Sequence, residues 1–234
     1  MKLFLCYFLM FFIYSVIGWM VESVYVSCQE EKFVNRGFLI GPYCPIYGCG
    51  SLLMILYLEQ YKDNLLTVFV LGVVICSVLE YLTSYLMEVC FKTRWWDYSE
   101  KKFNLNGRIC GENAILFGIG GVIVIYLFQP MVAHILRRFS ETALLIIAVC
   151  CLVIFVSDLI LSLNVVSRFK QTITNLEVKK DSTQDFSKMV RETILNNHKI
   201  FQSRLLAAFP NIDLKPFATI KEELKEELKE LLKK

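Results

Sequence analysis

The sequence predicts an all-α polytopic membrane protein with about five transmembrane helices, a parallel repeat of helical hairpins and a helical cytoplasmic C-terminal tail. Three observations lead to this fold class. Apolar residues make up 56% of the 234 residues. They are concentrated in long runs that end near residue 166, after which the chain becomes polar. A glycine pattern at residues 35–50 also recurs at residues 105–120.

A helix needs about 20 apolar residues to cross the hydrocarbon core of a bilayer. This length predicts a transmembrane domain over residues 1–166 and a cytoplasmic helical tail over residues 167–234. The tail carries apolar residues at helical spacing over 184–208 and again after Thr219. The expected spans are residues 3–27, 37–58, 65–90, 109–130 and 143–166.

The second span is interrupted near its start by Pro42 and Pro45. Each proline removes a backbone donor, so regular helix is expected to begin near Ile46. Residues 37–45 would then be irregular backbone, which survives in a membrane when it is buried in protein or lines a wet cavity. Such a break lines the binding site in many transporters. A tight interfacial turn before a tilted helix is the alternative interpretation.

The glycine pattern repeats at an offset of 70 residues, between residues 35–50 and 105–120. Small residues allow helices to pack closely in membranes. Because each copy follows a long apolar run, the pattern predicts two hairpins of the same orientation, with a site where they meet. The expected packing and break positions are Gly37, Gly41, Pro42, Pro45, Gly48, Gly50, Gly107, Gly111, Gly118 and Gly120.

The loops differ strongly in positive charge, which sets the expected orientation. One side carries eleven cations: Lys32, Arg36, Lys92, Arg94, Lys101, Lys102, Arg108, Arg168, Lys170, Lys179 and Lys180. The other side carries four, namely Lys2, Lys62, Arg137 and Arg138. The positive-inside rule therefore places the N-terminus outside the cell and the C-terminus in the cytoplasm.

Carboxylates within the spans predict a polar cavity. A charged side chain in a membrane is costly, and such residues usually face the protein interior or water. With the expected orientation, all of them fall in the cytoplasmic half, and Glu80 is the deepest. The candidate cavity or substrate residues are Glu22, Arg36, Glu80, Glu88, Arg94, Asp97, Arg108, Glu112 and Asp158.

The loop over residues 94–108 has two interpretations. Trp95, Trp96 and Tyr98 suit an aromatic belt at the lipid headgroups. Alternatively the loop is a lid, in which Arg94 pairs with Asp97 while Asn104 and Arg108 face the cavity.

Several other classes of site and partner are not indicated. The chain has nine scattered cysteines without a CxxC pair and two histidines, so we expect no metal site and no cofactor. It lacks the phosphate-binding pattern GxxxxGK[ST], so it is not itself an ATPase subunit. Nothing indicates nucleic-acid binding.

Five motifs together resemble the ABC-transporter type IV, or CmpB-like, permease family. They are GWMVES (18–23), NRGFLIGPYCPIYGCG (35–50), LEYLTSYLMEVCF (79–91), RWWDYS (94–99) and FNLNGRIC (103–110). The resemblance implies a multi-pass protein of the bacterial cell membrane with a cytoplasmic ATPase partner. Relatives usually have a small or apolar residue after GRIC, where this chain has Gly111 and Glu112, so Glu112 departs from the family pattern.

The leading hypothesis is a transport permease with a carboxylate-lined cavity on the cytoplasmic side, and the substrate is not readable. An enzyme acting on a lipid or polyprenyl headgroup at the inner leaflet is the alternative, with Glu22 or Glu80 as base and three arginines holding a phosphate. A scaffold that recruits partners through its tail is a third. The sequence favours a non-enzymatic role, with membrane lipid, an ATPase subunit and further copies of the chain as expected partners.

Overall fold

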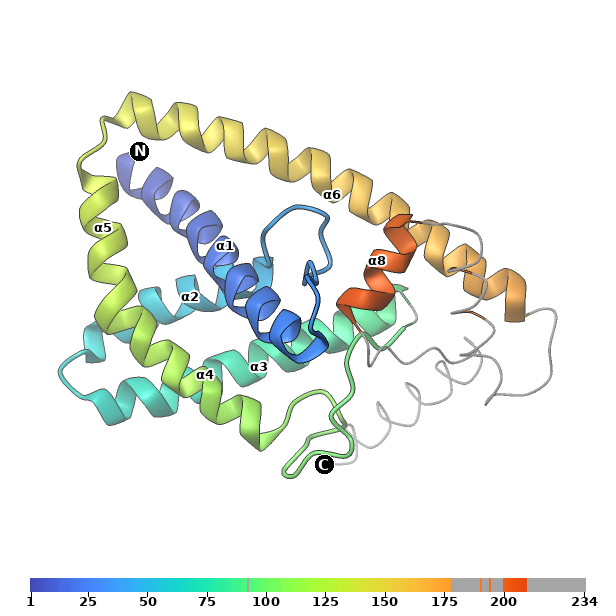
Figure 1. The fold of residues 1–234 in the computed structure, drawn as a ribbon. Coiled ribbons are helices and arrows are strands. Elements are labelled where there is room, and N and C mark those ends of the chain that lie inside the picture. The colour runs from blue at the N-terminus through green and yellow to red at the C-terminus, as the bar shows by residue number, and fades with distance from the viewer. Residues whose placement is uncertain (92, 178–189, 191–193, 195–199, 210–234) are drawn as a thin grey trace. The chain divides into compact units, whose positions relative to one another are not determined.

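The described part of the chain is almost entirely helical (Figure 1). A computed structural model describes residues 1–91, 93–177, 190, 194 and 200–209. These residues contain no β-strand, and Leu105 and Ile109 form an isolated antiparallel bridge. The helices are α1 (Lys2–Glu30), α2 (Pro45–Leu58), η1 (Glu59–Tyr61), α3 (Leu65–Phe91), α4 (Gly111–Ile123), the π-helix η2 (Val124–Phe128), α5 (Gln129–Arg137), α6 (Glu141–Glu177) and α8 (Ile200–Ala208).

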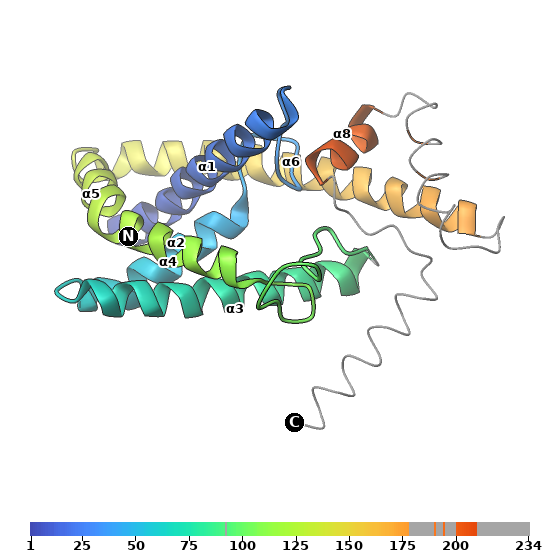
Figure 2. The same cartoon turned by 60° about the horizontal axis from the view of Figure 1, so that its bottom comes forward.

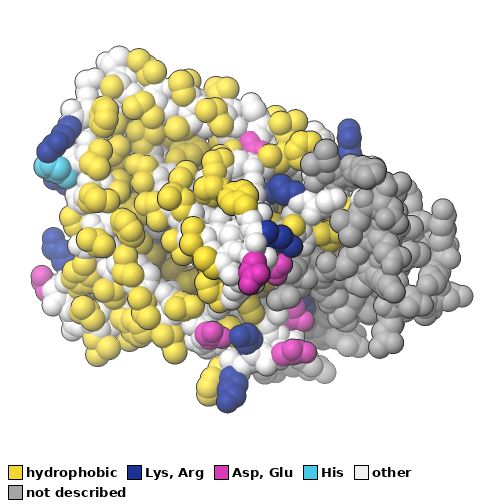
Figure 3. Space-filling model, viewed as in Figure 1, with side chains coloured by type: hydrophobic (Ala, Val, Ile, Leu, Met, Phe, Trp, Pro, Cys, Tyr) yellow, Lys and Arg dark blue, Asp and Glu magenta, His cyan; other side chains and the backbone are white. Residues whose placement is uncertain are grey.

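Four helical segments are long and apolar enough to cross a membrane, which confirms the predicted class of helical multi-pass protein. They are Lys2–Glu30, Leu65–Phe91, Gly111–Arg137 and Glu141–Gln171. The last two extend beyond the predicted 109–130 and 143–166, because hydropathy marks the part within lipid while the helix continues into polar residues. Most of their outward side chains are hydrophobic, as the visible face of residues 1–82 and 98–160 shows (Figure 3).

The segment predicted as the second span forms the shorter helix α2. It has 14 residues, or about 21 Å at 1.5 Å per residue. It begins at Pro45, next to the expected Ile46, and the residues before it are irregular. The hairpin repeat stays a prediction. Gly37 and Gly107, which correspond in that repeat, both have positive φ, at 112° and 67°.

The chain divides into two compact units. Unit 1 comprises Met1–Leu82 and Tyr98–Ile160. Its apolar core is built from α1, α2, α3, the α4–η2–α5 segment and the first part of α6. Glycines bring these helices together: a Cβ added to Gly72 on α3 would lie 3.8 Å from the Cα atoms of Gly118 and Gly121 on α4, and the two helices lie against each other there (Figure 2).

Unit 2 comprises Thr83–Asp97 and the chain from Leu161 onward. Its core centres on Trp95, whose ring packs at centroid distances of 5.0 Å from Phe209, 6.2 Å from Phe91 and 6.4 Å from Phe169. Trp95 is therefore a buried core residue and not a member of an aromatic belt. Within the helix expected over 184–208, the structure describes residues 190 and 194 and helix α8, all of them helical. The helix expected after Thr219 lies outside the described residues.

Candidate functional site

Glu22 is held near the end of α1 by an arginine and a tyrosine. Arg36 places its Nε 3.3 Å from Glu22 Oε2, and the Tyr47 hydroxyl of α2 donates a hydrogen bond to Glu22 Oε1. Gly18 lies one turn before Glu22, and any side chain there would overlap the Tyr47 ring. The spacing of glycine and glutamate on one face of α1 thus creates the space in which Tyr47 reaches the carboxylate.

The loop between α1 and α2 is fixed by side-chain hydrogen bonds to α1. Trp19 Nε1 donates to Asn35 Oδ1 at 2.7 Å, and Asn35 Nδ2 donates to the carbonyl oxygen of Ile40 at 2.9 Å. The backbone N–H of Arg36 donates to Ser23 Oγ at 3.2 Å. Two of these bonds pair backbone groups of the irregular segment, as a membrane requires, and the bond to Ser23 positions Arg36 beside Glu22.

Asp158 of α6 anchors the next part of the same loop. Its carboxylate accepts hydrogen bonds from the backbone N–H of Ile40 at 3.2 Å and of Gly41 at 2.9 Å, and from the Tyr43 hydroxyl at 2.6 Å. Asp158 was predicted to line a cavity. In the structure it contacts the broken segment, and its role in a cavity stays a prediction.

Glu80 of α3 is a second carboxylate near Glu22. Its side chain is buried, with 7% of the residue exposed, and the Tyr98 hydroxyl lies 3.4 Å from Oε1. The amide of Asn113, on the first turn of α4, interacts with both Glu80 and Tyr98. Among the described residues, Glu80 Oε2 has no hydrogen-bond partner. A buried carboxylate oxygen without a donor is energetically costly.

The two carboxylates belong to one cluster. Burial raises the pKa of the Tyr98 hydroxyl, and the charges of Glu80 and then Glu22 raise it further. Both carboxylates therefore act on the same hydroxyl, which stays protonated and able to donate. We name the set Glu22, Tyr47, Glu80, Tyr98 and Asn113 the carboxylate cluster. It joins α1, α2, α3, α4 and the loop before α4, all within unit 1.

The sequence model of one protein family, described as "Putative ABC-transporter type IV", matches residues 9–163. This match spans about two thirds of the chain and includes the whole carboxylate cluster. The chain belongs to this family. No curated protein and no solved structure matches it. Membership of an ABC-transporter-type family agrees with the four membrane-spanning helices and points to an ATPase partner.

The remaining candidates in this family member lie in three other places. Arg94 pairs with Glu88 in unit 2, with its Nε 3.2 Å from Glu88 Oε2, and its Nη1 lies 3.9 Å from Asp97 Oδ1. Glu112 is exposed and pairs with Lys101 at 3.1 Å. Asn104 was expected to face the cavity, but its amide donates to the carbonyl oxygens of Ser99 and Lys101 within the loop. These residues are not part of the carboxylate cluster.

Arg108 is fully buried, and its guanidinium carbon lies 5.7 Å from the centroid of the Tyr81 ring. This distance is within the range of a cation–π contact, which compensates part of the cost of burying the charge. This contact with Tyr81, the residue after Glu80, therefore helps to hold the loop before α4 against α3. Whether this loop acts as a lid stays a prediction.

Three residues of the cluster were missed from the sequence. Tyr98 was considered for an aromatic belt, and Tyr47 and Asn113 were not among the candidate residues. Each is a neutral group that hydrogen-bonds a carboxylate. The signal that could have found Tyr47 is its position just before Gly48, which places it on the face of α2 that packs on α1.

Proposed function

We propose that the chain is the membrane subunit of an ATP-driven transporter, and that its carboxylate cluster receives a cationic substrate from the cytoplasmic side. The observation that carries the proposal is the buried Glu80 carboxylate with an unpaired oxygen close to Glu22. With both carboxylates ionised, Arg36 balances one of the two charges. A cation at Glu80 Oε2 would balance the second and supply the missing contact.

The cluster must open for this function. Two pockets of unit 1, of about 630 and 430 Å³, are lined by other residues, and neither includes Glu22 or Glu80. The loop before α4 supplies Tyr98 and is stabilised by local contacts, such as the hydrogen bond of 2.7 Å from Tyr98 N–H to the Gly107 carbonyl oxygen. Movement of this short loop would expose Glu80 without disturbing the helices, as lids do in many proteins.

The ATP-driven part of the proposal predicts a copurifying ATPase. Because the chain lacks a phosphate-binding loop, any ATP hydrolysis in a gently extracted preparation of the tagged protein must come from a partner. We expect such hydrolysis, and we expect removal of residues 210–234 to reduce it several-fold. This truncation removes none of the four long apolar helices and keeps Phe209, which packs on Trp95, so membrane insertion should be unaffected. A lipid-linked substrate turned over by the purified chain alone would instead support the enzyme alternative.

A further inference from the structure

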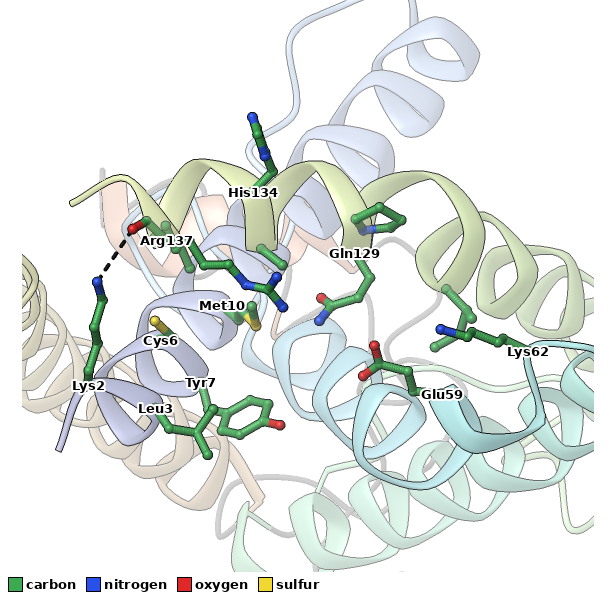
Figure 4. Close-up of a pocket in the computed structure, with 14 residues that line it drawn as sticks. Lys2, Leu3, Cys6, Tyr7, Met10, Glu59, Lys62, Gln129, His134 and Arg137 are labelled. Atoms are coloured by element: carbon green, nitrogen blue, oxygen red, sulfur yellow. Dashed lines mark hydrogen bonds between the residues drawn. The ribbon is translucent and has the colours of Figure 1, made fainter.

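A second polar site lies at the other end of α1 (Figure 4). A pocket of about 630 Å³ is bounded by the first residues of α1, by η1 and Lys62 just after it, and by η2 and α5. Met10, which lines it, precedes Glu22 by three turns of α1, or about 18 Å along the helix axis. The pocket is therefore separate from the carboxylate cluster. In the expected orientation it lies on the outer side of the membrane.

The pocket combines an apolar wall with a positively charged rim. The wall includes Leu3, Met10 and Leu136. The charged residues that line it are Lys2, Lys62, Arg137 and one acid, Glu59. Three cations against one carboxylate favour an anion. In the expected orientation the outer side carries four cations in all. Three of them, Lys2, Lys62 and Arg137, line this one pocket.

A buried amide completes the pocket. Gln129, of which 7% is exposed, accepts a hydrogen bond of 3.0 Å from the Tyr14 hydroxyl at its Oε1. This bond orients the side chain so that its amino group is a donor at the pocket wall (Figure 4). Gln129 directly follows the π-helix and precedes Pro130, which cannot donate to the preceding turn. π-Helical turns of this kind frequently occur at functional sites.

We propose that this pocket binds the phosphate group of an anionic phosphate ester. A phosphate offers several acceptor oxygens, which suits cations and an amide donor that approach from three different segments. The volume is within the range of small-molecule sites, and the apolar wall accommodates the carbon chain beside the phosphate. The ester is either the headgroup of a membrane lipid or a soluble molecule, since both present the same group.

The test is native mass spectrometry of the purified full chain in detergent, titrated with dioleoylphosphatidylglycerol and, for comparison, with dioleoylphosphatidylcholine. We expect tighter binding of the anionic lipid. Arg137→Gln should weaken that binding about tenfold, equivalent to ~1.4 kcal/mol. Arg138→Gln is the matched control, because Arg138 has the same charge but does not line the pocket. It should change the affinity less than twofold.

A second titration with glycerol 3-phosphate identifies the source of the phosphate. Binding of this soluble ester with the same sensitivity to Arg137→Gln supports the site and assigns it to a soluble molecule. Binding of the lipid alone, with that sensitivity, supports the site and assigns it to a headgroup. Equal losses for Arg137→Gln and Arg138→Gln would overturn the proposal, because they would indicate a general attraction to surface charge. Equal affinity for the two lipids would overturn it as well.

Discussion

Gly48→Ala should lower the thermal unfolding midpoint of the purified protein by about 6–12 °C, which corresponds to a loss of ~3 kcal/mol. A Cβ at this position would lie 2.5 Å from the backbone carbonyl oxygen of Phe11 and would also overlap the Ser15 side chain. A backbone atom inside α1 cannot move aside unless the whole helix does. The substitution therefore separates α1 from α2 and displaces Tyr47 from Glu22.

Gly120→Ala is the matched control for that prediction. Gly120 belongs to the second glycine string, yet a Cβ there would meet nothing within 4 Å. The unfolding midpoint of the Gly120→Ala variant should stay within about 2 °C of that of the parent protein, since alanine is also a better helix former than glycine. Similar midpoints for Gly48→Ala and Gly120→Ala would show that α1 and α2 do not approach as closely as described.

The second prediction concerns Asp158, which should be required to keep the broken segment closed. Asp158→Ala removes an acceptor that serves two backbone N–H groups and the Tyr43 hydroxyl, and each unmet buried donor costs about 1–3 kcal/mol. Cys44 follows Tyr43 and is buried, so it reports on this segment. In a variant that retains Cys44 as its single cysteine, Asp158→Ala should speed alkylation by N-ethylmaleimide at least tenfold. This factor corresponds to a decrease of ~1.4 kcal/mol in the free energy of local opening.

Two further variants serve as comparisons for the alkylation rate of Cys44. Asp158→Asn keeps one acceptor oxygen and should give an intermediate rate. Ser157→Ala changes the neighbouring residue, whose hydroxyl donates within the helix to the Val153 carbonyl oxygen at 2.8 Å, and it should not alter the rate. An alkylation rate unchanged by Asp158→Ala would mean that the loop is held by its other contacts, such as the bond from Cys44 N–H to the Ser15 carbonyl oxygen.

The sequence predicted the helices better than the contacts between them. Long apolar runs follow directly from the thickness of the membrane, and Pro42 and Pro45 disturb a helix wherever it lies, so the spans and the short α2 could be anticipated. These features depend on local chemistry and on the solvent alone.

The composition of the carboxylate cluster could not be anticipated in the same way. Tyrosine suits a membrane interface, a core or a hydrogen bond equally well, and the sequence does not distinguish among them. Tyr98 reaches Glu80 because the loop folds back through the positive φ of Gly107. The pocket at the start of α1 was missed for a similar reason, since Lys2, Lys62 and Arg137 lie far apart in the sequence and line one pocket only through helix packing.

The most direct test of the account is the charge selectivity of thiol labelling at Cys110. This cysteine precedes α4, is 2% exposed, and lies close enough to Tyr98 to act on it electrostatically. It should react only when the carboxylate cluster opens to water. In inside-out vesicles, a variant with Cys110 as its single cysteine would be treated with cationic and anionic methanethiosulfonates. A single Cys28, which is exposed beyond Glu22 on α1, calibrates access and surface potential.

We expect the cationic reagent to modify Cys110 about tenfold faster than the anionic one, relative to Cys28, because nearby carboxylates attract positive charge in a medium of low dielectric. Glu80→Gln keeps the shape of the side chain but removes its charge, and it should bring that ratio close to one. Both results are expected if the carboxylate cluster opens to receive a cation. A Cys110 that stays unreactive to both reagents while Cys28 reacts, or a ratio that Glu80→Gln leaves unchanged, would contradict it.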